Sequence, residues 1–260
     1  MKLMGVVNVT PDSFSDGGLY LDPGAAVEHG RELVAAGATI LDVGGESTRP
    51  GAEPVSEDEE LRRVVPVVEG LRGAGAEVSV DTSKASVAAA ALAAGATIVN
   101  DVTALRGDPE MAALCAERGA TVVLMHMRGT PRTMQEEPTY SDVVAEVRGF
   151  LAERVERAEA AGIAAERIWL DPGIGFGKTA AHNLELLRRL GELRELGRPL
   201  VVGTSRKSFI GRLDGSEADE RLGGTIASSV LAAAAGAEVL RVHDVAEMAD
   251  AMRLATALLG

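Results

Sequence analysis

The sequence predicts an α/β fold, a single (β/α)8 barrel of the TIM type that spans residues 1–260 as one domain. Short apolar segments rich in β-branched residues alternate with alanine-rich amphipathic segments from end to end, without a linker. The junction between helix and strand recurs along the chain, and eight such units fit the usual barrel length of about 250 residues. An open doubly wound sheet is the competing architecture.

Eight segments carry the strand pattern, because they are short, apolar and bounded by turn residues. Near-continuous apolar strands that alternate with helices are typical of a parallel sheet covered by helices. The predicted strands are residues 3–9, 39–45, 77–82, 97–102, 121–126, 167–173, 200–205 and 238–244.

Amphipathic segments between the strands predict helices, among them residues 25–37, 56–75, 84–95, 141–162, 219–236 and 245–259. A helix that ends in glycine and turns into an apolar strand recurs at 35–40, 93–98, 117–122 and 234–239. Long loops rich in Gly, Pro, Ser and Asp follow the first two strands, at 8–18 and 44–60. Loops of this length that carry reactive side chains are expected to be mobile.

Composition excludes several classes of function. Apolar residues make up 46% of the chain and no apolar run reaches the roughly 18 residues of a membrane helix, so neither disorder nor membrane insertion is expected. The net charge of -13 opposes binding to nucleic acid or anionic lipid. The single cysteine, Cys115, is predicted to be buried in a helix, and no signal-peptide cleavage region follows the N-terminus. A cytoplasmic protein is expected.

Polar side chains stand at the carboxyl end of every predicted strand, where barrels of this kind place their active sites. A polar side chain inside or just past an apolar strand costs several kcal/mol unless it is paired or binds a ligand. A ring of functional groups is therefore predicted around the barrel mouth. Its members are Asn8, Asp42, Glu46, Ser47, Thr48, Arg49, Asp81, Asn100, Asp101, His126, Arg128, Asp171, Ser205, Arg206, Lys207, Arg241, His243 and Asp244.

Single members of this ring also have structural interpretations. Asp81 could cap the next helix, and His126 alone is more typical of core packing than of a ligand. Asp101 and Asp244 could be helix caps or could orient other side chains. The functional interpretation therefore depends on the convergent set and not on one residue.

Two nucleotide-binding patterns fail in the glycine-rich segment after the sixth strand. Pro172 stands where the P-loop needs a glycine, and Lys178 stands where G-x-G-x-x-G needs its third glycine. No histidine pair has the spacing of a zinc hydrolase. Magnesium bound by one or two protein oxygens and a substrate phosphate is compatible with the residues.

Cations converge after the last two strands, at Arg206, Lys207, Arg241 and His243. Phosphate sites in this fold frequently form from the loops after strands seven and eight. Acidic and amide groups end the third, fourth and sixth strands, opposite this basic region. The sequence thus predicts a ligand with a hydrogen-bond-donating ring at one end and phosphate at the other.

Eight motifs follow one another along the chain: GVVNVTPDSFSDGG, DVGGESTRPGA, SVDTSK, IVND, LMHMRGTP, LDPGIGFGK, SRKSFIG and RVHD. In this order and over the whole chain, they resemble the dihydropteroate synthase family. The resemblance implies that 6-hydroxymethyl-7,8-dihydropterin diphosphate is joined to para-aminobenzoate, giving 7,8-dihydropteroate and pyrophosphate for folate synthesis. It also implies Mg²⁺ as cofactor and inhibition by sulfonamides, which mimic the aminobenzoate.

The same resemblance assigns roles residue by residue. Catalytic roles fall to Asp81, Lys207 and Arg49. Binding of the pterin diphosphate is assigned to Thr48, Asp81, Asn100, Asp171, Lys207, Arg241 and His243, and binding of para-aminobenzoate to Thr48, Arg49, Pro50, Ser205 and Lys207. Walls of the pterin slot would be Val102, Val123, Met125 and Phe176, and Asn8 would reach the Mg²⁺. Barrel packing is an equally good interpretation of the two valines.

The mechanism expected by this resemblance is dissociative, with Asp81 stabilising a pterin methylene cation. Three alternatives stay open: a pterin-binding methyltransferase, a Schiff-base aldolase that uses Lys207, and a non-catalytic pterin-binding relic. A methyltransferase has no use for a diphosphate site, so Arg241 and His243 argue against it. The expected partners are small molecules, not nucleic acid or membrane, and the family together with the apolar last helix favours a homodimer.

Overall fold

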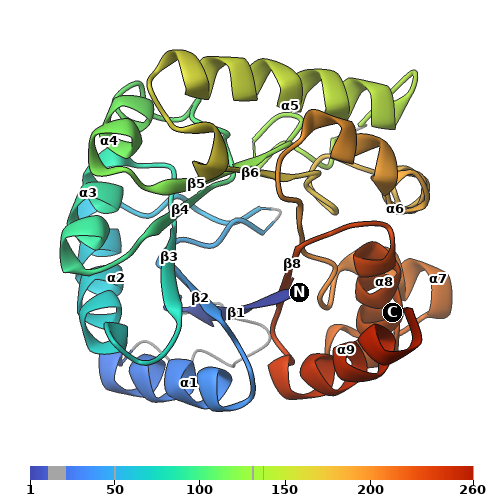
Figure 1. The fold of residues 1–260 in the computed structure, drawn as a ribbon, viewed down its shortest axis with the longest axis horizontal. Coiled ribbons are helices and arrows are strands. Elements are labelled where there is room, and N and C mark those ends of the chain that lie inside the picture. Colours follow the sequence, from blue (N-terminus) through green and yellow to red (C-terminus); the bar gives the residue numbers. More distant parts are fainter. Residues whose placement is uncertain (11–21, 50, 131, 137, 260) are drawn as a thin grey trace.

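The computed structural model describes residues 1–10, 22–49, 51–130, 132–136 and 138–259, in which eight parallel strands are surrounded by helices (Figure 1). Every strand overlaps one of the predicted strands. The strands are β1 (Lys2–Asn8), β2 (Ile40–Gly44), β3 (Glu77–Asp81), β4 (Ile98–Asp101), β5 (Thr121–Met125), β6 (Ile168–Asp171), β7 (Val201–Val202) and β8 (Val239–Val242).

The strands form a barrel. Their order in the sheet is β6-β5-β4-β3-β2-β1-β8-β7, so the first strand lies between the second and the last. A parallel bridge between Leu170 and Leu200, with the backbone N–H of Leu170 donating to the carbonyl of Pro199 at 2.9 Å, joins β6 to the segment before β7. These contacts confirm the (β/α)8 barrel and exclude the open doubly wound sheet.

Helices form the outer ring seen in Figure 1. All six predicted helices are present, and α4, α6 and α7 are added to them. The helices are α1 (Pro23–Ala35), α2 (Glu57–Leu71), α3 (Ala85–Ala94), α4 (Met111–Arg118), α5 (Val143–Ala160), α6 (Ala180–Arg188), α7 (Ser208–Asp214), α8 (Leu222–Ala234) and α9 (Val245–Leu259), with short 3₁₀ turns η1 (Ala165–Arg167), η2 (Leu190–Leu196) and η3 (Ala218–Glu220).

Local sequence fixes where these helices begin. The side chain of Asp22 accepts from the backbone N–H of Ala25 at 3.1 Å and caps α1. Ser56 caps α2 in the same way, and four acidic residues in the first turn of α2 complement the positive end of its dipole. Each cap satisfies a backbone donor that the helix itself leaves without a partner.

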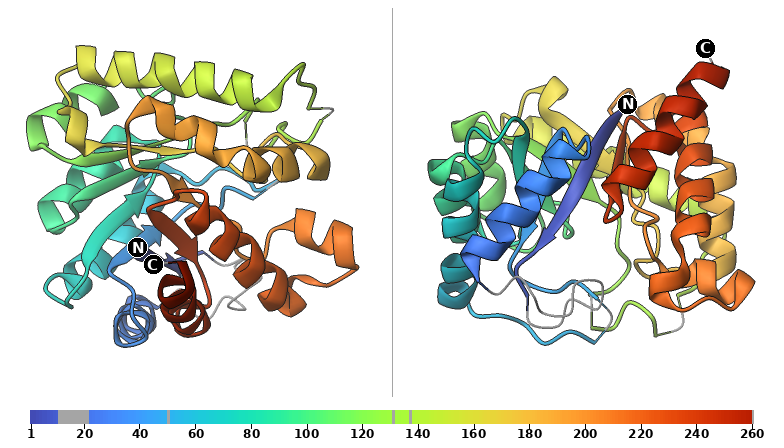
Figure 2. Two further views of the ribbon diagram at one scale, coloured as in Figure 1. Left: turned by 45° about the vertical axis from the view of Figure 1, so that its right-hand side comes forward. Right: turned by 90° about the horizontal axis from the view of Figure 1, so that it is seen from below.

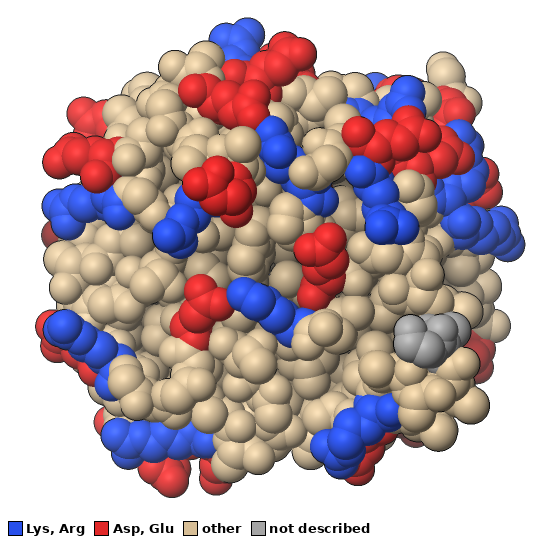
Figure 3. All heavy atoms as spheres, in the orientation of Figure 1, with Lys and Arg blue, Asp and Glu red and all other residues tan. Residues whose placement is uncertain are grey.

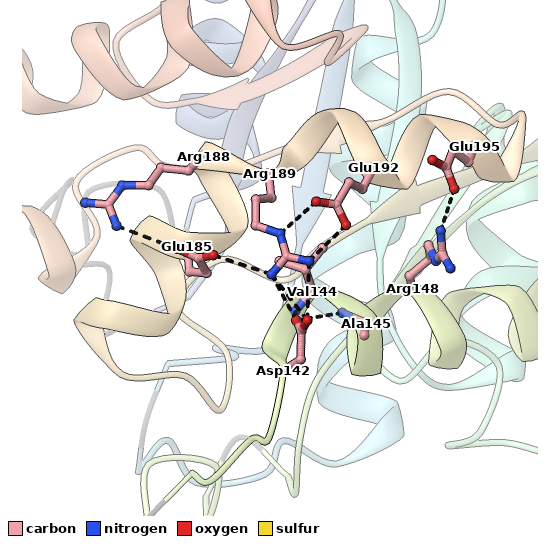
Figure 4. A network of polar contacts seen from close by, with 9 residues as sticks. All are labelled: Asp142, Val144, Ala145, Arg148, Glu185, Arg188, Arg189, Glu192 and Glu195. Atoms are coloured by element: carbon pink, nitrogen blue, oxygen red, sulfur yellow. Dashed lines mark hydrogen bonds and ion pairs between the residues drawn. The ribbon is translucent and has the colours of Figure 1, made fainter.

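One polar network ties neighbouring helices of the outer ring together (Figure 4). Asp142 caps α5 by accepting from the backbone N–H groups of Val144 and Ala145, at 2.9 and 3.1 Å. Arg189, which follows α6, donates to Asp142 at 3.2 Å and to Glu192 of η2 at 2.7 Å. The guanidinium thus links the start of α5 to α6 and η2.

The interior of the barrel is packed in layers. Ile40, Ile98, Trp169 and Val239 come from the even-numbered strands and are buried together with Met4, Val123 and Val201 from odd-numbered strands. Side chains along a strand alternate between its two faces. The residues two positions further on the even strands therefore also point into the barrel, one layer closer to the carboxyl ends of the strands.

The two ends of the barrel differ. Both chain termini lie at one end, and the loops that follow the strands gather at the other (Figure 2). On the face that carries the termini, acidic and basic side chains are interspersed over a large uncharged area (Figure 3). None of the helices in the described ranges is both long enough and apolar enough to cross a membrane.

The long loop predicted after β1 falls on residues 11–21, which are outside the described part of the chain. The loop after β2 is described except for residue 50. The expected mobility of both loops stays a prediction.

Candidate active site

The layer above the apolar interior is polar and consists of Asp42, Asn100, Asp171 and Arg241. Each follows by two positions an apolar residue of the same even-numbered strand, so the strand alternation alone brings all four together. Asp42 is fully buried, and Asn100 and Asp171 are 6% exposed. Four polar side chains directly above an apolar layer mark the candidate site.

Arg241 forms hydrogen bonds to two carboxylates at this layer. Its Nε donates to Oδ2 of Asp42 at 2.6 Å, and its NH2 group donates to Oδ2 of Asp81 at 3.0 Å. Asn100 also donates to Oδ2 of Asp42, at 3.0 Å. One guanidinium is thus shared between two buried carboxylates.

The electrostatics of Asp81 follow from this arrangement. Burial, with the charge of Asp42 second, raises the pKa of Asp81 to about 8, while Arg241 opposes both effects. The protonation state of Asp81 is therefore sensitive to any charge that enters the site.

Asp42 has a larger structural part than the sequence indicated. The sequence pattern places Asp42 among the polar residues at the strand ends, but the family resemblance assigns it no role in binding or catalysis. The structure shows that its Oδ2 atom orients both Arg241 and Asn100, and that its Oδ1 atom is buried with no hydrogen-bond partner among the described residues. A charged residue in the middle of an apolar strand was the signal that could have identified it.

Asp171, Phe176 and Lys207 lie together on another side of the barrel mouth. Oδ1 of Asp171 accepts from the backbone N–H of Gly173 at 2.6 Å. Lys207 Nζ lies 4.9 Å from the centroid of the Phe176 ring and donates to the carbonyl of Ile174. The structure thus brings three of the residues assigned to the pterin into one place.

The pKa values of Asp171 and Lys207 move in opposite directions. Burial raises the pKa of Asp171, against the effect of the Lys207 charge. Burial lowers the pKa of Lys207 to about 8, against the effect of Asp171. Each ion limits the change of the other, so the pair resists neutralisation more than either group would alone.

Ser205 and His243 join the ends of β7 and β8. The Ser205 hydroxyl accepts from the backbone N–H of His243 at 3.2 Å and lies 3.0 Å from Nδ1 of its ring. A hydroxyl that accepts from the backbone can still donate its own hydrogen to Nδ1, and the ring then carries its proton on Nε2. Burial, together with Arg241 and other cations, lowers the pKa of His243 to about 3, so the imidazole is a neutral donor.

Arg206 stands between Ser205 and Lys207 in the left-handed region, at φ 57°. Its Nε donates to Oδ2 of Asp244 at 3.0 Å, and its backbone N–H donates to the hydroxyl of Thr225 at 3.0 Å. A residue other than glycine is rarely found in this conformation, and these contacts hold it there. The turn directs the side chains on both sides of Arg206 toward the barrel mouth.

Three of the four predicted slot walls lie together. Val102 and Met125 are buried in one apolar cluster, and Phe176 packs against it. Val123 instead belongs to the layer below, among Met4, Ile40 and their neighbours. The packing interpretation therefore describes Val123 better than the slot interpretation does.

The glycine-rich segment after β6 is held by Lys178, which interrupts the dinucleotide pattern. Lys178 is 3% exposed, and its Nζ lies 2.9 Å from His126 Nδ1 and donates to the carbonyls of Gly173 and Phe176 at 2.9 Å. Gly173 has φ 67°, and a Cβ atom there would lie 1.9 Å from the carbonyl oxygen of His126. This close approach explains the glycine and fixes Phe176 beside the slot.

The second loop brings Thr48 and Arg49 to the same end of the barrel. Both are half-buried, and the charge of Arg49 contributes to the lowered pKa of His243. Arg49 therefore lies near the end of β8. Pro50, the third loop residue assigned to the aminobenzoate, lies outside the described residues.

Asn8 ends β1 beside Gly44 of β2 and is half-buried. Within the described ranges, no group of three or more His, Cys, Asp and Glu side chains could hold a metal ion. One amide oxygen does fit Mg²⁺, since this ion keeps several waters and takes its other ligands from substrate phosphates.

Comparisons with known proteins agree with this geometry. The family model described as "Pterin binding enzyme" matches residues 4–243. The dihydropteroate synthase of Escherichia coli (strain K12) is 52% identical over 258 residues, which cover 99% of this chain and 91% of that protein.

Two solved structures show the same fold. A dihydropteroate synthase from Yersinia pestis in a sulfonamide drug complex has a TM-score of 0.96 at 48% identity, with coverage of 99% of this chain and 94% of the other. The Xanthomonas albilineans enzyme in complex with 7,8-dihydropteroate has a TM-score of 0.88 at 48% identity, with coverage of 99% and 93%. By sequence, fold and coverage, this chain belongs to the dihydropteroate synthase family of pterin binding enzymes.

Proposed function

We propose that this chain catalyses its family's reaction by dissociative displacement of pyrophosphate. As a dihydropteroate synthase, it condenses 6-hydroxymethyl-7,8-dihydropterin diphosphate with para-aminobenzoate to give 7,8-dihydropteroate in folate synthesis. In the proposed order, the C–O bond to the diphosphate breaks first and its electron pair leaves with the diphosphate. The aniline nitrogen then attacks the methylene carbon and loses a proton.

The pterin ring is assigned to the side of the site that holds Asp171. The ring offers a 2-amino group and an N3–H as a donor pair, and a buried carboxylate can accept both. Asn100 and Lys207 face the same space from β4 and β7. A carboxylate that already accepts from the Gly173 backbone is held in one orientation, which favours a planar ligand.

The diphosphate is assigned to the ends of β1 and β8. Arg241 supplies a charged donor, and His243, held as the Nε2–H tautomer by Ser205, supplies a neutral one. Asn8, with phosphate oxygens, would hold Mg²⁺, which would neutralise charge on the leaving diphosphate when bound. Thr48 and Arg49 would approach the same groups from the second loop.

The aminobenzoate is assigned to the space between the second loop and the β7 turn, beside Arg49, Ser205 and Lys207. Two cations at this place suit its carboxylate. Pro50 is proposed as a further contact. The aniline nitrogen would then face the pterin methylene group.

The observation that carries this proposal is the sharing of Arg241 between Asp81 and Asp42. A carboxylate and a guanidinium in contact can stabilise opposite charges that develop a few ångströms apart. The developing methylene cation favours the ionised form of Asp81, which would stabilise it in turn, and Arg241 would stabilise the departing diphosphate. Separation of charge accounts for most of the activation free energy of a dissociative path, so this pair would act on the rate-limiting barrier.

Replacing Asp81 by Asn tests the proposal. We expect kcat to fall by about a hundredfold or more, because the negative charge beside the cation is lost. The dissociation constant of the pterin diphosphate should change by less than about tenfold, since Asp171 and Arg241 remain.

The matched control is Asp250→Asn, which removes a carboxylate from an exposed pair with Arg253. It should turn over like the unmodified enzyme. Unchanged kcat in Asp81→Asn, measured by pyrophosphate release and with binding measured by calorimetry, would contradict the proposed role.

We further propose that the enzyme is a cytoplasmic homodimer. Cys115 is a buried free thiol, which suits a reducing compartment. Leu231 of α8 and Leu254 and Leu258 of α9 are 68%, 63% and 77% exposed, and large apolar side chains on adjacent helices favour a protein interface. Sedimentation velocity should give twice the chain mass of 26.9 kDa, and Leu231→Glu should shift it to the monomer. A monomer at micromolar concentration would contradict the dimer.

A further inference from the structure

Three charged side chains from separate segments lie in contact, one of them in the second loop. Glu46 follows β2, Glu60 lies in the first turns of α2, and Lys84 stands directly before α3. Lys84 Nζ donates to Oε2 of Glu60 at 2.5 Å and also to Oε2 of Glu46. No role in substrate binding falls to any of the three, although Glu46 and Lys84 belong to the GGESTRPG and SVDTSK segments.

Glu46 also closes the loop on itself. Its Oε2 atom accepts from the backbone N–H of Val55 at 3.3 Å, nine residues further along the chain. Thr48 and Arg49 lie between these two residues. The carboxylate therefore joins the beginning and the end of the segment that carries them.

Helix α2 holds the beginning of the same loop. Arg63 NH1 donates to the carbonyl of Gly45 at 2.9 Å. A Cβ atom on Gly45 would lie 2.8 Å from Val64 Cγ2 and 3.1 Å from Glu60 Cγ, so only glycine allows the helix to approach this closely. The loop thus starts from a fixed point against α2.

Lys84 connects the loop to the catalytic strand. It lies three residues after Asp81, the last residue of β3. The Glu60 side chain is 1% exposed, so its charge needs Lys84 as a partner and holds the ammonium in place. Burial lowers the pKa of Lys84, but hydrogen bonds from Glu46 and Glu60 outweigh it and raise the pKa overall, which keeps the cation charged.

We propose that Glu46 and Lys84 are positioning residues for the aminobenzoate site, because they fix the described parts of the second loop, residues 45–49 and 51–55, relative to the end of β3. Glu60 pairs with Lys84, Lys84 pairs with Glu46, and Glu46 accepts a hydrogen bond from the far end of the loop. The inference rests on the proposed function, since it takes Thr48 and Arg49 as contacts of the aminobenzoate. It gives a structural reason why Arg49 lies near the end of β8.

The direct test is Glu46→Ala. This change releases the loop but leaves Lys84 paired with Glu60, so no buried charge loses its partner. We expect KM for para-aminobenzoate to rise about tenfold, the size expected from loss of a charge-assisted hydrogen bond. KM for the pterin diphosphate should rise less, because Thr48 is only one of its assigned contacts and the others lie on or after β3, β4, β6, β7 and β8. The melting temperature should stay close to the unmodified value.

Hydrogen exchange gives a readout that does not depend on activity. In Glu46→Ala, the backbone N–H groups of the non-proline residues between 46 and 55, that of Val55 above all, should exchange faster, while those of β3 should not change. The conservative variant Glu46→Gln keeps an oxygen for the Val55 N–H and for Lys84, and should recover most of the loss. Glu77→Ala is the matched control, because Glu77 pairs with Lys2 at 2.9 Å on the opposite end of the barrel.

The outcomes separate the two proposals. If the unmodified enzyme releases no pyrophosphate with both substrates, the proposed function fails, whatever the variants do. If it turns over and Glu46→Ala matches Glu77→Ala in both KM values and in exchange of residues 46–55, the positioning role is overturned. Equal increases of the two KM values would also overturn it.

Discussion

His126 shows how the same residue type serves two purposes at one end of the barrel. Its sequence position suggested either a ligand or a packing residue, and the structure confirms packing. The ring is 6% exposed, meets Phe150 edge-on at 4.9 Å and has Lys178 Nζ at 2.9 Å from Nδ1. His243 is also neutral, and its ring is assigned to the proposed diphosphate site.

The buried state of His126 predicts a pH dependence of stability. Burial, with the charge of Lys178 second, lowers its pKa to about 2, whereas an unfolded histidine titrates near 6.5. Because the folded pKa is the lower one, the unfolded chain binds more protons as pH falls below 6.5. The stability contributed by the neutral ring is present above pH 6.5 and is lost as pH falls toward 2.

His126→Asn removes this proton linkage while keeping an acceptor for Lys178. The variant will be less stable at pH 7.0, and its deficit should shrink by about 2 kcal/mol at pH 5.0. Urea unfolding of both proteins at the two pH values measures this difference. A deficit that is the same at both values would show that His126 is protonated in the folded state.

The sequence identified the polar residues of the site but not their partners. Asp42, Asn100, Asp171 and Arg241 could be found because each interrupts an apolar strand. That Arg241 pairs with Asp42 and Asp81, or that the Ser205 hydroxyl lies beside Nδ1 of His243, depends on distances between strands far apart in the chain. A single sequence contains no such distances.

At the scale of elements, strands were more predictable than short helices. Most residues of the eight strands are buried and apolar, so the hydrophobic pattern locates the strands. Strand β7 was predicted at 200–205 and covers only Val201–Val202, because Gly203 and the polar residues after it leave the ladder and turn toward the site. The sequence pattern shows where a segment is apolar, but the backbone hydrogen bonds determine where the strand ends.

The segment after β6 owes its shape to Lys178 and not to glycines around a nucleotide. Among the described residues, the Lys178 ammonium contacts the carbonyls of Gly173 and Phe176 and the ring of His126. Burial lowers the pKa of Lys178 well below its usual value. A loop that resembles a phosphate cradle is thus filled by the chain's own cation, and Phe176 is held in the slot.

At the scale of the molecule, the overall charge disfavours anionic substrates, whereas individual cations of the site favour them. The net charge is -13, yet Arg49, Lys207 and Arg241 lie at the end of the barrel assigned to two anionic substrates. Long-range attraction therefore contributes little to capture, and close contacts at the barrel mouth must supply it. Family membership decides for a synthase over the methyltransferase, aldolase and relic alternatives.

The central claim is that this barrel joins a pterin diphosphate to para-aminobenzoate at the layer built from Asp171, Arg241 and their neighbours. Pyrophosphate release with both substrates and Mg²⁺ tests it most directly. We predict release in equal amount to 7,8-dihydropteroate, with dependence on the aminobenzoate and a loss of about a hundredfold in Asp81→Asn. No release from the folded protein with both substrates present would contradict the account.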